Sequence, residues 1–164
     1  KDIDFLNSVS AKRFLGGGVL YELSHELDCM LGIFGSSKII GASFSNTGVF
    51  DIDVEDRASI LAQTKNKVDV SIQIDFCTNP PFREVSIRGT KGSIIWNISK
   101  GLLYLNNGTN QSKNINEIYS PEQSFKKQLD HFFECCKGHS KVKVSVKDGL
   151  NVINLIKKIH SYQK

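Results

Sequence analysis

Apolar residues between Gly18 and Gly35 recur with the period of an α-helix. At 100° per residue they fall in one sector, whereas Glu22 and His25 fall on roughly the opposite side. Three glycines precede the segment, which suits a close backbone approach, and Gly35 ends it in the usual C-terminal position. The spacing therefore predicts one amphipathic helix with an ionisable face that the core does not use. Its apolar residues are Leu20, Leu23, Leu27, Met30, Leu31 and Phe34.

After Gly35 the chain changes to short segments rich in β-branched residues, which are typical of strands. Residues 68–76 alternate strictly between apolar and polar, as in an antiparallel strand with unlike faces. Asn79-Pro80-Pro81 is expected to break the sheet, residues 89–92 to form a hairpin turn, and Asn106–Asn116 to form a polar loop. The predicted strands are Lys38–Phe44, Ala58–Gln63, Val68–Phe76, Arg83–Arg88 and Ser93–Ile98.

Two further helices are predicted toward the C-terminal end. Ser120 with Pro121 and Gln123 is typical of a helix start, and Ser145 with Asp148 resembles a capping box. Both helices carry an apolar stripe that we expect to be buried. The stripes are Phe125, Leu129, Phe132, Phe133 and Cys136 in the first helix, and Val152, Leu155, Ile156 and Ile159 in the second.

The order of these elements indicates an α+β fold. We expect an open, mostly antiparallel sheet of about six strands with helices packed on one face. A length of 164 residues is that of one ordinary domain, so residues 1–164 are expected to form a single unit. The second face of the sheet would be free for association.

Composition narrows the function classes. Hydrophobic content of 40% and charge of 23% are typical of a soluble globular chain, and no apolar run approaches the ~20 residues of a membrane span. Residues 1–98 carry 10 Lys/Arg against 12 Asp/Glu, and residues 99–164 carry 11 against 5. The basic part would suit an anionic ligand such as a nucleotide sugar, although a solvated lysine-rich surface is the simpler interpretation. No aromatics interleave with the lysines, so nucleic acid is not expected as a partner.

Cysteine and histidine positions leave two metal alternatives open. Glu22-x-x-His25 has the spacing of the carboxylate–histidine pairs of di-iron bundles, but the sequence contains no second such pair. Cys135 and Cys136 lie near His131 and His139, where packing at a helix end is the preferred interpretation. We therefore expect no metal site. Free thiols at Cys29, Cys77, Cys135 and Cys136 indicate a reducing cytoplasm.

The residues Gly-Gly-Gly-Val-Leu-Tyr-Glu-Leu-Ser-His-Glu-Leu-Asp, from Gly16 to Asp28, resemble the motif that opens the C-terminal domain of the Gfo/Idh/MocA oxidoreductases. Val54-Glu55-Asp56, residues 87–96 and residues 125–150 are similar to later segments of that domain. Together these segments cover nearly the whole chain from about Ser10. The resemblance implies an α+β substrate-binding and dimerisation domain.

The same resemblance implies roles for individual residues. His25 would transfer a proton and Glu22 would support it, while Lys12, Arg13 and Tyr21 are candidates to contact the substrate. For Lys12 and Arg13 an ordinary place on the surface is the simpler interpretation. Many members of the family place the acidic residue four positions before the histidine, whereas Glu22 and His25 are three positions apart. A branch that acts on sugar nucleotides and sialic-acid-like sugars has a similar Glu-Leu-Ser-His-Glu form.

Two motifs of the full-length family members are missing. The chain has no Gly-x-Gly-x-x-Gly after a strand and no Glu-Lys-Pro motif, both of which lie upstream in the family. We therefore expect the C-terminal half of a cytoplasmic dehydrogenase that acts on a sugar, sugar nucleotide or cyclic polyol. The full-length protein would use NAD or NADP, and the isolated chain would bind neither and be inactive. The alternative is a non-catalytic sugar-binding or dimerisation module of the same fold.

A homodimer is the expected assembly. In the resembled family the open sheet face pairs with its twin from another subunit. The polar face of the strand at residues 68–76 would provide this surface, because the helices are expected to cover its apolar face. Its residues are Asp69, Ser71, Gln73, Asp75 and Cys77.

Overall fold

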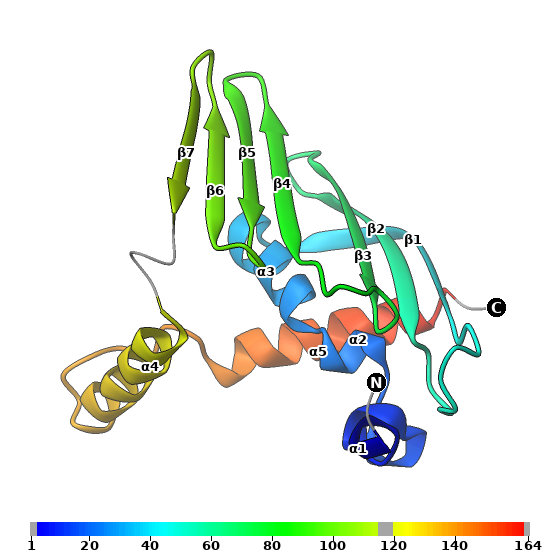
Figure 1. The fold of residues 1–164 in the computed structure, drawn as a ribbon. Coiled ribbons are helices and arrows are strands. Elements are labelled where there is room, and N and C mark those ends of the chain that lie inside the picture. Colours follow the sequence, from blue (N-terminus) through cyan, green and yellow to red (C-terminus); the bar gives the residue numbers. More distant parts are fainter. Residues whose placement is uncertain (1–2, 115–119, 163–164) are drawn as a thin grey trace. The chain divides into compact units, whose positions relative to one another are not determined.

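The computed structural model describes residues 3–114 and 120–162 (Figure 1). The chain divides into two compact units. We call residues 1–77 with 144–164 the helix-covered unit and residues 78–143 the hairpin unit. All the strand pairings found in the described part are antiparallel, which confirms the predicted α+β class.

Three antiparallel strands form the sheet of the helix-covered unit, in the order β1-β2-β3. They are β1 (Ser37–Ser45), β2 (Arg57–Thr64) and β3 (Asp69–Asp75). Burial alternates along the whole of β2, and Ile60 lies opposite Ile72 of β3. The two faces are therefore unlike, as the alternating pattern of residues 68–76 predicted.

Helices cover the apolar face of this sheet. α2 (Val19–Glu22) packs on β2 and β3, while α5 (Val146–His160) packs on β1 and on α3 (His25–Phe34). Before α2 lie α1 (Ile3–Leu6) and the 3-10 turns η1 (Val9–Ala11) and η2 (Arg13–Leu15). Figure 1 shows α2, α3 and α5 grouped beside β1–β3.

The core of this unit joins residues that lie far apart in the sequence. Its largest fully buried apolar side chains come from α2, α3, β2 and α5, and they include Leu20, Leu27, Ile60, Ile156 and Ile159. All four residues predicted to be buried in the last helix are buried. The carboxylate of Asp148 accepts hydrogen bonds of 2.7 Å from both the amide and the hydroxyl of Ser145, so the predicted capping interaction forms.

The hairpin unit contains a second sheet of four strands in the order β4-β5-β6-β7. The strands are β4 (Glu84–Gly89), β5 (Gly92–Asn97), β6 (Leu102–Asn106) and β7 (Asn110–Asn114). The described residues thus form seven strands in two sheets, not one sheet of about six. Pro80 and Pro81 follow β3 and precede β4 in the sequence, and since proline has no N–H to donate, the predicted break occurs there.

The prediction of a loop over Asn106–Asn116 is wrong for its central part. Asn106 lies opposite Asn110, and Gly108 between them has a φ of 101° that suits a hairpin turn. Main-chain hydrogen bonds build β7 although its side chains are polar, so polarity alone did not indicate a loop. Asn116 lies outside the described residues.

Helix α4 (Pro121–Cys136) begins as predicted, with the Ser120 hydroxyl accepting a hydrogen bond from the amide of Gln123. The prediction that its apolar stripe is buried is wrong, because four of the five side chains are more than half exposed and Cys136 is exposed too. A period of 3.6 residues predicts an apolar face but not what covers it. The exposed fractions are 71% for Phe125, 54% for Leu129, 59% for Phe132 and 51% for Phe133.

None of the helices in the described ranges is long and apolar enough to cross a membrane.

Candidate functional site

Two glycines allow backbone segments to crowd around the start of α2. A Cβ on Gly17 would meet the carbonyl oxygens of Val9 and Ser10, and Gly18 has a φ of 118° that favours glycine. The amide of Gly18 donates a hydrogen bond of 2.9 Å to the carbonyl of Ser10. The glycines therefore bring the turn at residues 9–11 against the helix that carries Glu22.

Glu55 holds the beginning of α2 from the opposite direction. Its carbonyl accepts a hydrogen bond of 3.1 Å from the amide of Val19, and its Oε1 accepts one of 3.4 Å from the amide of Leu20. Oε1 also lies 4.0 Å from Nε2 of His160. Glu55 therefore ties the start of α2 to the end of α5.

The predicted single helix is broken at Leu23 and Ser24. The amide of Ser24 bonds to the carbonyl of Tyr21, and the amide of Glu26 bonds to that of Leu23, so the backbone tightens to three-residue spacing. The apolar stripe survives the break: Leu20, Leu27 and Met30 are buried, and Leu23, Leu31 and Phe34 are half-buried. Glu22 ends α2 and His25 begins α3, so the two residues do not share one continuous helix face.

His25 contacts Glu26, not Glu22. Its Nε2 lies 3.2 Å from Oε1 of Glu26, and the two side chains are 47% and 18% exposed respectively. The carboxylate of Glu22 instead accepts a hydrogen bond of 2.6 Å from the hydroxyl of Ser10. Sequence reasoning named neither Ser10 nor Glu26 as a site residue. The Gly17 approach is the signal in the sequence that points to Ser10.

The three residues named as substrate contacts differ in whether other residues of the protein already hold their side chains. The Arg13 guanidinium donates two hydrogen bonds to the carbonyl of Asp53, of 3.0 Å from Nε and 2.7 Å from an Nη. The half-buried Tyr21 packs its ring edge-on against His160, with centroids 5.8 Å apart. The ammonium of Lys12 makes no hydrogen bond or ion pair with residues that the structure describes. Arg13 therefore has a structural partner, whereas Lys12 is available.

A groove of about 610 Å³ lies beside His25. Its polar side comes from the start of α3, with Ser24, His25 and Asp28. Its apolar side comes from the beginning of α5 and from Val144, two residues before the helix, and also includes Val146, Leu150 and Ile153. More than 100 residues separate the two walls in the sequence, so the sequence pattern did not predict their contact. Since His25 is half exposed at the groove, it can meet a small molecule there.

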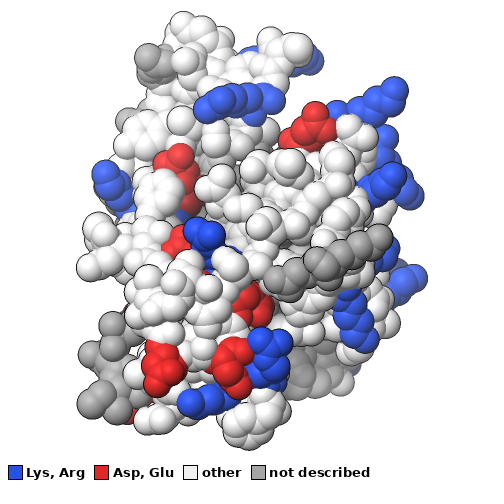
Figure 2. Space-filling model, turned by 90° about the vertical axis from the view of Figure 1, so that its right-hand side faces the viewer, with Lys and Arg blue, Asp and Glu red and all other residues white. Residues whose placement is uncertain are grey.

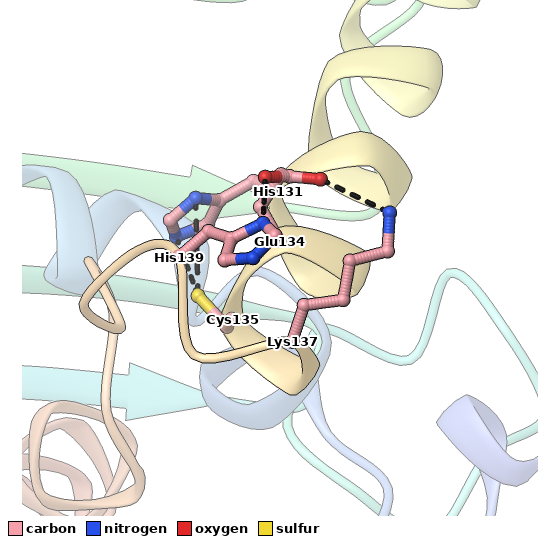
Figure 3. Close-up of polar contacts among 5 residues, drawn as sticks. All are labelled: His131, Glu134, Cys135, Lys137 and His139. Carbon is pink, nitrogen blue, oxygen red and sulfur yellow. Dashed lines mark hydrogen bonds and ion pairs between the residues drawn. The ribbon is translucent and has the colours of Figure 1, made fainter.

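Figure 3 shows the histidine and cysteine cluster near the end of α4, which the sequence left open as a second possible metal site. Sγ of Cys135 lies 3.5 Å from Nε2 of His131, while Nδ1 of His139 lies 3.1 Å from a carboxylate oxygen of Glu134. Lys137 pairs with the other oxygen of that carboxylate at 3.3 Å. These contacts divide the cluster into a thiol–imidazole pair and a carboxylate with two basic partners. Among the described residues no group of three or more histidine, cysteine or acidic side chains is arranged to hold a metal ion.

Asp56 is fully buried and organises the loop before β2. Its carboxylate accepts hydrogen bonds of 3.0 Å from the Thr47 amide and 2.5 Å from the Thr47 hydroxyl. Sγ of Cys77 lies 3.6 Å away. Burial raises the pKa of the Cys77 thiol, and the negative charge of Asp56 adds to the rise. Cys77 is therefore a poor nucleophile at neutral pH, and this cluster is structural.

Charges of both signs appear on the molecular face in Figure 2. Lys and Arg accompany Asp and Glu there, so this face does not present the field of a single sign that a nucleic-acid surface would have.

Many solved structures resemble the fold of this chain, and three examples are oxidoreductases with bound ligands. Levoglucosan dehydrogenase in complex with NADH and levoglucosan has a TM-score of 0.83 and 16% identity, covering 96% of this chain and 51% of its own. An oxidoreductase from Agrobacterium radiobacter in complex with NAD+, L-tartaric acid and magnesium has a TM-score of 0.80 and 18% identity, with coverage of 99% and 51%. KijD10, a 3-ketoreductase from Actinomadura kijaniata in complex with NADP and TDP-benzene, has a TM-score of 0.78 and 14% identity, with coverage of 94% and 49%.

The chain thus spans about half the length of these proteins. Its sequence has no match among the curated proteins. The profile described as "Oxidoreductase family, C-terminal alpha/beta domain" matches residues 10–161, which is nearly the whole chain. The chain belongs to the Gfo/Idh/MocA oxidoreductase family and forms its C-terminal α/β domain.

Proposed function

We propose that this chain is the substrate-binding half of an NAD(P)-dependent dehydrogenase that acts on a sugar or a sugar nucleotide. The observation that carries the proposal is the half-exposed His25 at the polar side of the groove. Similar structures support the substrate class, since one is a levoglucosan dehydrogenase in complex with levoglucosan and another is a UDP-N-acetylglucosamine 3-dehydrogenase from Acidithiobacillus ferrooxidans.

The dinucleotide would be bound by another domain. The sequence contains no Gly-x-Gly-x-x-Gly turn, which is the element that binds the pyrophosphate of a dinucleotide, so this chain does not supply that element. The nicotinamide would supply the exchange of hydride with the alcohol carbon of the substrate. The chemistry that we assign to this chain is confined to the substrate hydroxyl and its proton.

His25 is the proposed acid–base residue. During oxidation it accepts the hydroxyl proton while the carbon–oxygen bond becomes a carbonyl, and during reduction it returns that proton. Glu22, held by Ser10, binds a neighbouring hydroxyl of the substrate. Lys12 and Tyr21 are the proposed further contacts to the sugar, and like Glu22 they lie outside the residues that line the groove. Arg13 joins them only if its guanidinium leaves Asp53 or uses its remaining donors.

The test joins this chain to a nucleotide-binding domain of the family and assays nucleotide sugars and free sugars with NAD and NADP. His25→Ala should lower turnover by about 100- to 10,000-fold, the usual contribution of a general acid or base. His139→Ala is the matched control, because that exposed histidine is paired with Glu134 on α4. Unchanged turnover in His25→Ala would refute the proton-transfer role. Sugar binding without any turnover in the joined parent protein would favour the non-catalytic module.

We further propose that the protein is a homodimer. Six apolar side chains lie opposite one another on a single face of β4–β6, and Ile94 and Trp96 among them are 38% and 36% exposed. Apolar sheet faces of this kind associate more readily than the polar face of β3. We call Val85, Ile87, Ile94, Trp96, Leu103 and Leu105 the apolar hairpin face.

Light scattering of two variants distinguishes the two faces. Trp96→Lys should split the dimer, because it places a charge within the apolar hairpin face. The double variant Ser71→Lys with Gln73→Lys changes the polar face of β3, and it should leave the dimer intact. The reverse result would assign the interface to β3, and a monomeric parent protein would end the proposal.

A further inference from the structure

The two ring nitrogens of His25 have different surroundings. Nε2 lies 3.2 Å from Oε1 of Glu26, whose side chain is only 18% exposed. Neighbouring residues in a helix normally point apart, but these two meet in the first turn of α3. Within the described part of the chain, Nδ1 makes no hydrogen bond or ion pair. One nitrogen is therefore engaged by the protein and the other is left open.

The nature of the partner decides where the proton of a neutral imidazole lies. A carboxylate oxygen 3.2 Å from a ring nitrogen attracts an N–H there and repels a lone pair, so this contact favours the hydrogen on Nε2. The lone pair is then on Nδ1, because a neutral imidazole carries one N–H. His25 lines the groove together with Ser24 and Asp28, whereas Glu26 is not among the groove residues.

We propose that Glu26 is a positioning residue that fixes the Nε2–H tautomer of His25 and thereby makes Nδ1 the atom that exchanges protons in the groove. Glu26 acts through His25 and touches no substrate. When Nδ1 accepts a proton, the ring becomes an imidazolium and the Glu26 carboxylate stabilises its positive charge. The catalytic half of this inference rests on the proposed function, but the tautomer does not.

The tautomer is measured directly on the 164-residue chain. Long-range proton–nitrogen NMR spectra of the ¹⁵N-labelled chain distinguish a protonated from an unprotonated ring nitrogen. With His25 neutral, we expect Nε2 protonated and Nδ1 unprotonated. Glu26→Ala should shift His25 toward the tautomer mixture of free imidazole, and Glu26→Lys should favour Nδ1–H, since an ammonium can only donate to Nε2.

Asp28→Asn is the matched control for this measurement. Asp28 lies in the same turn of α3 and lines the same groove, but its carboxylate makes no hydrogen bond or ion pair with the His25 ring, so the change removes only a nearby negative charge. The Nε2–H tautomer should therefore persist in Asp28→Asn. A dispersed amide spectrum shows that each variant is folded. An Nδ1–H tautomer in the parent chain, or an unchanged tautomer in Glu26→Lys, would overturn the inference.

A kinetic test follows in the protein joined to a nucleotide-binding domain. Glu26→Ala should lower kcat by at least about tenfold with little change in KM. In the wrong tautomer Nδ1 carries the hydrogen and cannot accept the substrate proton, whereas no substrate contact is lost. Glu26→Asp should recover part of the loss. In a His25→Ala background Glu26→Ala should have no further effect on kcat, because Glu26 acts only through the His25 ring that is already absent.

The two proposals fail in different ways. If His25→Ala leaves turnover unchanged, the proposed acid–base role is wrong while the tautomer result stands. If His25→Ala abolishes turnover but Glu26→Ala changes neither kcat nor the NMR spectrum, the positioning role of Glu26 is wrong.

Discussion

The hydroxyl of Ser10 donates a hydrogen bond of 2.6 Å to Oε2 of Glu22 across twelve residues of sequence. The bond joins the 3-10 turn η1 to the last residue of α2. Its acceptor is a carboxylate oxygen, and hydrogen bonds to a carboxylate are stronger than those between neutral groups when it is charged. Ser10 thus fixes the orientation of the carboxylate that is proposed to bind a substrate hydroxyl.

Ser10→Ala is predicted to lower kcat/KM about tenfold in the joined enzyme, because Glu22 loses the donor that orients it. Glu22→Ala should lower kcat/KM further than Ser10→Ala, since it removes the carboxylate itself. In a double-mutant cycle the two losses should be clearly less than additive. Fully additive losses would show that the hydroxyl and the carboxylate act independently.

Gly17→Ala is predicted to destabilise the chain by roughly 1–3 kcal/mol, because the added methyl group meets backbone carbonyls that cannot easily move. Gly32→Ala is the matched control, since Gly32 is exposed in α3 and open space surrounds its Cβ position. That change should stabilise the chain by about 0.5–1 kcal/mol through helix propensity. Urea unfolding measures both, and equal effects would contradict the close approach of residues 9 and 10.

Asp56→Ala is predicted to reduce the free energy of unfolding by roughly 1–3 kcal/mol, because the Thr47 amide and hydroxyl lose a buried acceptor. Asp51→Ala in the same loop changes an exposed carboxylate and should stay within about 0.5 kcal/mol of the parent. The measurement is the midpoint of urea unfolding in each variant, with the dependence of the unfolding free energy on urea concentration unchanged. Similar values for the two variants would mean that the buried carboxylate has no special role.

Hydrogen bonds from the Ser145 hydroxyl and amide hold the pKa of Asp148 below its ordinary value. A lowered pKa in the folded state means that the unfolded chain binds the proton first as the pH falls. The stabilising contribution of the capping carboxylate is therefore complete above about pH 5 and is lost as the pH falls through the lowered value. An NMR titration of the Asp148 carboxyl carbon should give a pKa below about 3.9, and Ser145→Ala should raise it. A midpoint at or above the ordinary value in the parent would contradict the capping interaction.

The sequence by itself determined the local elements. Helix starts at Ser120 and Ser145, the hairpin at residues 89–92 and the stripe from Leu20 to Phe34 depend on neighbouring residues, so short-range patterns predict them. The family motif likewise lies in one continuous stretch. The loop predicted over β7 failed because main-chain pairing with β6 does not require apolar side chains.

Only the tertiary structure decided which residues meet. The break at Leu23–Ser24 separates Glu22 from His25, and contacts with Ser10 and Glu26 then give each its own partner. The groove joins His25 to residues 144–153, and the buried Asp56 accepts hydrogen bonds from Thr47 in the loop before β2. Periodicity gives the direction of a side chain relative to its own helix or strand. The partner that it reaches depends on how distant segments pack, and for this reason the stripe of α4 was predicted correctly as apolar and wrongly as buried.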